Sequence, residues 1–121
     1  MEVRPRNLEV RKVIIALEKK SRSSKKQVWK KLASCINVPR RSRISVNLWK
    51  LNKLAEKNKG KVLVVPGKVL SEGIFNQKAK IVALEISDRA KQKLLVSGEY
   101  LSYFELMDKV SANDLVIVKW L

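Results

Sequence analysis

Two short apolar runs in the second half of the chain restrict what it can fold into. Segments 62–65 (Val-Leu-Val-Val) and 81–84 (Ile-Val-Ala-Leu) carry apolar side chains at every position. A strand with one solvent-exposed face alternates apolar and polar residues, whereas a continuous apolar run is typical of a strand buried on both faces. We therefore expect buried strands over 61–65 and 80–86.

Helix signals follow these strands. Ser87 is a good N-cap for a helix that ends before Gly98, and Ser102 with Glu105 forms a capping box for a shorter helix with Phe104, Met107 and Val110 facing inward. Two further strands are expected, over 100–101 and 115–119. The resulting order of strand, turn, strand, helix, strand, helix, strand predicts a small α/β layer.

Glycine marks two turns in this half. Pro66 and Gly67 suit the two central positions of a type II turn, because proline fixes φ at the first and glycine accepts positive φ at the second. Gly73 marks another turn. All three residues are predicted to have structural roles.

The first half of the chain predicts three helices, because apolar residues recur there at helical spacing. They span about 8–20, 24–36 and 46–58, with a loop over 21–23. Ser24 and Gln27 match a capping box, and Ser45 is a candidate N-cap. We expect one domain over 1–121, comprising a basic helical region (1–61) and a near-neutral α/β layer (62–121).

Charge is divided very unevenly between these regions. The chain carries a net charge of +16; residues 1–61 contain 19 Lys and Arg against 4 acidic residues, and residues 62–121 contain 8 against 7. A surface this basic attracts polyanions. The expected partner is nucleic acid or an anionic membrane surface, bound by the first half.

The segment Pro39-Arg40-Arg41-Ser42-Arg43 concentrates three guanidinium groups, each able to bind a phosphate with two hydrogen bonds. Because Pro39 disfavours regular helix there, we expect an ordered, exposed corner. Further candidates for contact with a nucleic-acid backbone are residues of the N-terminal arm and of the predicted helices: Arg4, Arg6, Lys25, Lys26, Lys50 and Lys53.

Catalytic and metal chemistry are not expected. The chain has no histidine and one cysteine, Cys35, so it lacks an imidazole base and the ligands of a structural zinc site. Its acidic residues are scattered, and no phosphate-binding glycine motif occurs. We predict no enzyme activity, cofactor or small-molecule substrate.

Location is also predicted. A lone thiol favours a reducing compartment, and the longest apolar run near the N-terminus, 13–17, is too short for a signal peptide or a membrane span. We expect a cytoplasmic chain that does not span a membrane.

The three tryptophans have different expected roles. Trp29 falls in the apolar stripe of its helix and is expected in the core. Trp49 lies off the apolar face of the third helix, so it packs on a neighbouring helix, is exposed, or stacks on a base. Trp120 anchors the last strand or faces a partner protein.

Several motifs together resemble a known family. Pro39-Arg40-Arg41-Ser42-Arg43, then Val46-Asn47-Leu48, then the segment 64–70 (Val-Val-Pro-Gly-Lys-Val-Leu) with Gly73, resemble the archaeal and eukaryotic large-subunit ribosomal protein "eighteen-e". The resemblance covers nearly the whole chain, and the compact length looks archaeal.

The resemblance implies a structural constituent of the large ribosomal subunit that binds large-subunit ribosomal RNA and neighbouring ribosomal proteins. It implies basic N-terminal helices followed by a small, irregular ββα-type layered domain, as in the C-terminal part of universal large-subunit protein fifteen. It also places five residues at or near RNA: Arg40, Arg41, Arg43, Asn47 and Lys68.

Two alternatives remain open from the residues alone. One is a DNA-binding helix-turn-helix protein that uses the second and third helices, although the intervening segment 37–45 is longer than the usual turn. The other is a small RNA-processing enzyme, against which the scattered acidic residues argue.

Overall fold

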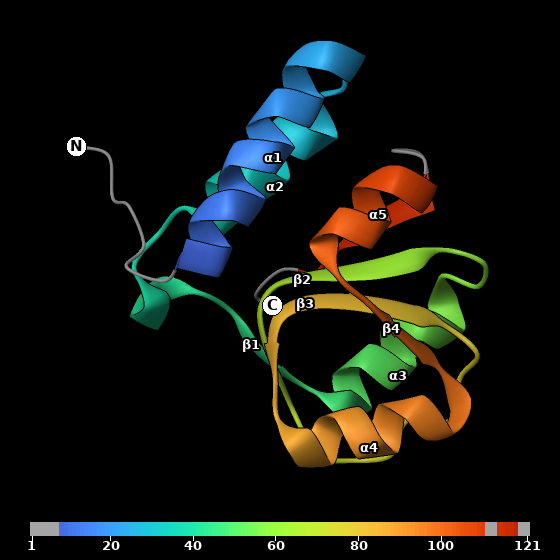
Figure 1. The fold of residues 1–121 in the computed structure, drawn as a ribbon. Helices are drawn as coiled ribbons and strands as arrows, with labels where there is room; N and C mark the ends of the chain where they lie inside the picture. Colours follow the sequence, from blue (N-terminus) through green and yellow to red (C-terminus); the bar gives the residue numbers. More distant parts are fainter. Residues whose placement is uncertain (1–7, 111–113, 119–121) are drawn as a thin grey trace.

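The computed structural model of the chain describes residues 8–110 and 114–118 (Figure 1). Its described elements are helices, strands and one short 3₁₀ helix. In chain order they are α1 (Leu8–Ser24), α2 (Gln27–Ile36), η1 (Arg40–Ser42), β1 (Ser45–Asn47), α3 (Leu48–Lys57), β2 (Val62–Leu70), β3 (Lys80–Ile86), α4 (Asp88–Ser97), β4 (Glu99–Leu101), α5 (Tyr103–Lys109) and β5 (Leu115–Ile117).

The strands form one sheet in which every described pairing is parallel. β2 pairs with β3 along one edge, and β4 lies beyond β3. Along its other edge, β2 pairs with β5 through 62–64 and with β1 through 68–70. The parallel sheet covered by helices confirms the predicted mixed α/β class.

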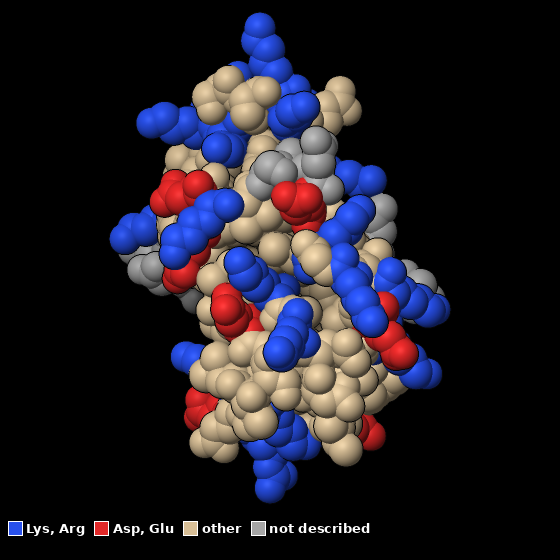
Figure 2. All heavy atoms as spheres, turned by 90° about the vertical axis from the view of Figure 1, so that its right-hand side faces the viewer, with Lys and Arg blue, Asp and Glu red and all other residues tan. Residues whose placement is uncertain are grey.

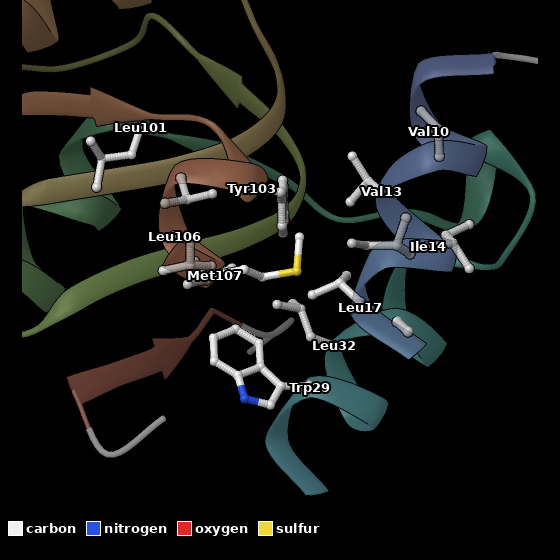
Figure 3. Close-up of a cluster of buried hydrophobic side chains, with 14 of the residues drawn as sticks. Val10, Val13, Ile14, Leu17, Trp29, Leu32, Leu101, Tyr103, Leu106 and Met107 are labelled. Carbon is white, nitrogen blue, oxygen red and sulfur yellow. The ribbon is translucent and has the colours of Figure 1, made fainter. Parts of the chain in front are cut away.

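Two apolar cores lie on the two faces of the sheet. One core joins α1, α2 and α5 to side chains of the sheet such as Val64 and Val82. Figure 3 shows the part of this core that lies between α1, α2 and α5. The other joins β1, α3 and α4 to side chains such as Leu63 and Ile81. Consecutive strand residues therefore point into different cores, which explains the unbroken apolar runs. Both parts of the chain supply each core, because β1 and α3 come from the basic first half.

Several predictions for the second half are confirmed. β3 has the predicted bounds, and α4 begins after Ser87, whose Oγ accepts a hydrogen bond from the Ala90 amide at 3.2 Å. The Ser102 Oγ likewise accepts from the Glu105 amide at 3.1 Å. One inward assignment was wrong: Phe104 is 42% exposed, and Tyr103 and Leu106 fill the core instead. The predicted last strand is seen over 115–117, and Lys119 lies outside the described residues.

The predicted loop over 21–23 was wrong, because α1 continues to Ser24. The Ser24 Oγ donates a hydrogen bond to the Lys20 carbonyl oxygen at 2.7 Å and accepts one from the Lys26 amide at 3.4 Å, so it is not the N-cap of α2. α1 ends where Lys25 adopts a φ of 57°. The predicted capping box is absent from α2, whose N-cap is Lys26 without a side-chain bond.

The third helix begins two residues later than predicted. Ser45–Asn47 form β1, in parallel register with 68–70 of β2, and α3 starts at Leu48. Ile44 and Val46 are buried while Ser45 is exposed, an alternation typical of a strand. Ser45 is therefore a strand residue rather than an N-cap.

The predicted type II turn at Pro66 and Gly67 was wrong. Both residues lie within β2, and Gly67 does not have positive φ. An irregularity in the pairing with β3 falls between Val65 and Lys68. Gly67 instead permits a close approach, since a Cβ there would collide with the backbone of Ile44. The turn at Gly73 is confirmed, with φ of +96°.

Candidate nucleic-acid interface

The arginine corner is an ordered turn of 3₁₀ helix. The Ser42 amide donates a hydrogen bond to the Pro39 carbonyl oxygen at 2.8 Å, which closes η1. The Arg41 side chain is exposed beside it, and that of Arg40 lies outside the described part. The predicted corner outside regular α-helix is therefore present, with Arg41 available to a ligand.

Arg43 differs from Arg41, because its side chain is half-buried and bonded to the fold. Its Nε donates a hydrogen bond to the Ile36 carbonyl oxygen at 3.1 Å, tying the corner to the end of α2. Burial raises the pKa of Tyr103 well above its ordinary value, and the nearby Arg43 charge acts in the opposite direction. The Tyr103 hydroxyl donates to the Val65 carbonyl oxygen at 2.6 Å. The Arg43 side chain is thus bonded to the fold, whereas that of Arg41 is exposed.

Exchanging these two arginines for alanine should have different consequences. Arg43→Ala is expected to lower the free energy of unfolding by about 1.5 kcal/mol, since it removes a charge-assisted hydrogen bond. Arg41→Ala should change it by less than about 0.5 kcal/mol but should weaken RNA binding. Urea unfolding and RNA titration of both variants measure the difference. Equal stability of the two variants would show that Arg43 does not hold the corner.

Lys68 is brought to the corner by the β1–β2 pairing. It lies opposite Ser45 in the register, and its amide donates to the Ile44 carbonyl oxygen at 3.0 Å. Arg43, Ser45, Lys68 and Glu85 line a small cavity of about 80 Å³ at this point. Glu85 offsets part of the positive charge there. Arg43 and Lys68, which are 25 positions apart in the sequence, thus line the same cavity.

The remaining predicted residues are dispersed. Lys25 and Lys26 lie at the α1–α2 connection, remote from the sheet in Figure 1. Lys50 and Lys53 belong to α3 on the opposite face of the sheet, where the Lys53 Nζ lies 5.4 Å from the centre of the Trp49 ring. Asn47 is half-buried at the end of β1. Two predicted residues, Arg4 and Arg6, lie outside the described residues, as does Trp120.

A basic groove between α1 and α2 was not predicted. Its volume is about 550 Å³, and three cations line it: Arg22, Lys25 and Lys30. One acidic residue, Glu18, shares the lining. The groove was missed because residues 21–23 were predicted to be a loop. Arg22 lines the groove as a residue of α1. The four-residue spacing of Glu18 and Arg22, with Lys25 three residues later, was the sequence pattern that could have indicated this groove.

Positive charge gathers on the helical hairpin of α1 and α2. In Figure 2 the upper end, which carries the α1–α2 connection, bears Lys and Arg side chains without acidic ones, whereas farther down Lys and Arg are mixed with Asp and Glu around an uncharged area. A row of cations along a groove follows a nucleic-acid backbone and binds it without reading its sequence.

Curated proteins similar to this chain agree with the predicted resemblance, although no protein-family model matches it. "Large ribosomal subunit protein eL18" of Pyrobaculum aerophilum is 38% identical over 106 residues, which cover 87% of this chain and 85% of that protein. The protein of the same name from Nanoarchaeum equitans is 36% identical over 118 residues, covering 94% and 95%. That from Methanopyrus kandleri is 35% identical over 109 residues, covering 87% and 86%.

The chain belongs to the eL18 family. These three relatives are archaeal, and the alignments cover most of their length. The motifs that carry the eL18 resemblance have clear structural positions. The corner forms η1, Val46 and Asn47 form β1, and 64–70 forms most of β2.

A helix-turn-helix arrangement is not formed by this eL18 chain. α2 packs in the core with α1 and α5, and α3 packs in the other core with α4. The two helices of the predicted motif therefore lie on opposite faces of the sheet. Such a pair cannot place its second helix in a DNA groove while its first helix crosses the backbone.

Among residues 8–110 and 114–118, no group of three or more His, Cys, Asp or Glu side chains could hold a metal ion. Within the same ranges, no helix is long and apolar enough to cross a membrane.

Proposed function

We propose that this chain is a structural constituent of the large ribosomal subunit that binds large-subunit ribosomal RNA. The observation that carries the proposal is family membership: the curated relatives are large-subunit proteins and match the chain along most of its length. As a ribosomal protein it is located on cytoplasmic ribosomes. Its role is to hold RNA and protein in place, without enzyme activity.

The proposed RNA-binding surface comprises the hairpin groove and the arginine corner. RNA helices are recognised mainly by shape and backbone, so many lysine and arginine contacts serve this purpose. Arg22, Lys25 and Lys30 line the groove, and Arg41 projects from the corner. Further proposed contacts come from the other predicted residues: Arg4, Arg6, Lys26, Arg40, Asn47, Lys50, Lys53 and Lys68. Arg43 acts mainly by holding the corner in place.

The near-neutral part of the surface is the proposed site for neighbouring ribosomal proteins. The most exposed of its described large apolar side chains are Ile74 (74%), Leu95 (52%) and Val96 (83%). Exposed apolar residues on a soluble domain are often covered by protein partners. In this proposal most RNA contacts come from 1–61, and the exposed apolar side chains of 62–121 contact protein, within a single domain.

The proposed fold relationship is to the C-terminal part of universal large-subunit protein fifteen. Its support is a layered sheet with two cores in which an irregular strand, β2, occupies the centre. The basic hairpin of α1 and α2 covers one face of that sheet. In this proposal the hairpin is the part that extends toward RNA.

Sedimentation of native lysate through sucrose at low and high salt tests the proposal. The chain is expected to travel with the large subunit in both conditions, because buried contacts persist when salt weakens phosphate contacts. Loss at high salt alone would indicate a loosely bound protein. Its absence from the subunit at low salt would contradict the proposal.

A further inference from the structure

A second groove lies between α1 and α5, on a different side of α1 from the basic hairpin groove. Its volume is about 280 Å³. One wall consists of α1 residues spaced as a single helix face, and the other of α5 residues with similar spacing: Ala16, Lys19, Lys20 and Ser23 from α1, and Phe104, Met107 and Asp108 from α5.

The floor of this groove is part of a packed core. Met107 is only 8% exposed and points toward Leu17 in Figure 3, in the core that also contains Trp29. The Lys20 Nζ lies 5.8 Å from the centre of the Trp29 ring, so this ammonium group is held beside the groove. The groove is therefore a formed feature with a fixed apolar base.

Phe104 is the feature that the fold does not explain. Its ring is 42% exposed although the neighbouring Tyr103, Leu106 and Met107 are buried. An exposed aromatic ring beside two lysines is the combination on which unpaired bases stack in RNA-binding proteins. Asp108 adds a carboxylate that can accept a hydrogen bond from an amino group of a base.

We propose that the α1–α5 groove binds one unpaired nucleobase of an RNA strand. The base stacks on Phe104, Lys19 and Lys20 hold the adjoining phosphates, and Asp108 faces the edge of the base. This inference rests on the proposed RNA-binding function and names the form of RNA that this groove takes. The groove volume of about 280 Å³ is near the lower end of the range for ligand pockets and suits one base.

The positive wall favours RNA over a protein side chain as the occupant. Lys19 and Lys20 bring two cations to the groove and Asp108 one anion, which leaves the lining net positive. A phosphate beside a stacked base complements that charge, whereas an apolar side chain of a partner protein would leave it unmatched.

The test compares Phe104→Leu and Phe104→Tyr in the full chain. Leucine keeps apolar bulk and helix propensity but removes the ring, and tyrosine retains the ring. The probes are a fluorescein-labelled single-stranded RNA decamer of random sequence and a ten-base-pair RNA duplex, titrated in 100 mM KCl by fluorescence anisotropy. Thermal unfolding checks that each variant is folded.

Phe104→Leu is expected to weaken binding of the single strand about tenfold and of the duplex less than twofold. Phe104→Tyr should bind both probes as the original chain does. Unchanged single-strand affinity in Phe104→Leu would overturn the inference and leave the groove to a protein side chain. An equal loss for both probes would also overturn it. In both cases RNA binding by the original chain would leave the proposed function standing, whereas failure of the original chain to bind either probe would contradict both proposals.

Discussion

Replacing Gly67 by alanine is expected to remove about 3 kcal/mol of folding stability, a large part of the 5–15 kcal/mol typical of a domain. The added Cβ would collide with the Ile44 carbonyl oxygen. That oxygen accepts the Lys68 amide in a 3.0 Å hydrogen bond where β1 meets β2. Overpacking costs about 1–3 kcal/mol and the strained hydrogen bond about 1 kcal/mol more. Urea unfolding followed by circular dichroism measures the loss.

Gly60→Ala is the matched control for Gly67→Ala. Gly60 has a φ of +83°, but nothing lies within 4 Å of a Cβ added there. Its replacement should cost only about 1 kcal/mol, through backbone strain. If Gly67→Ala were no more destabilising than Gly60→Ala, the inference that Gly67 packs closely against the Ile44 backbone would be wrong. Valine at position 67 should be worse than alanine because its branches enlarge the same collision.

Gly67 also shows where reasoning from the sequence failed. The pair Pro66-Gly67 indicates a turn when it is considered alone, because glycine's tolerance of positive φ is a local property. Its actual role depends on Ile44, which lies 23 positions earlier and reaches Gly67 only when β1 is in place. A contact between distant segments leaves no local sequence pattern. The residues around Gly67 therefore gave no evidence against a turn.

The strands and helices predicted well are those whose signal is local. β3 and α4 combine apolar spacing with a Ser87 cap inside a few residues, and both were located correctly. β1 was missed because three residues are too few to outweigh the helical pattern that follows from Leu48. The parallel partner of β1 is supplied by β2 beyond α3, and nothing in residues 45–47 specifies it.

The sequence indicated which basic residues the candidate site contains, but not how the fold arranges them. Charge counts correctly assigned the basic surface to the first half of the chain, since net charge needs no coordinates. They could not separate Arg41, which is exposed, from Arg43, which is bonded to the end of α2. They also could not show that Arg22 and Lys30, from different helices, line one groove.

Reversing the charge of the hairpin groove should have the largest effect on RNA binding. The triple variant Arg22→Glu, Lys25→Glu, Lys30→Glu is expected to lower affinity for large-subunit ribosomal RNA at least about a hundredfold at 100 mM salt. If each residue neutralises one phosphate, the slope of log affinity against log salt should become shallower by about 2 to 3. All three side chains are exposed, so thermal unfolding should stay nearly unchanged. Filter binding across a salt series measures both quantities.

The control variant is Lys78→Glu, Lys80→Glu, Arg89→Glu, whose side chains are exposed in the near-neutral half. Both triple variants lower the net charge from +16 to +10, so any long-range effect of total charge is the same in each. A tenfold or smaller loss in the control beside the larger loss in the groove variant would assign the phosphates to the hairpin. Equal losses would contradict that assignment, because affinity would then follow the charge of the whole molecule. The salt slope decides between these cases, because its change reports how many phosphate contacts each variant has lost.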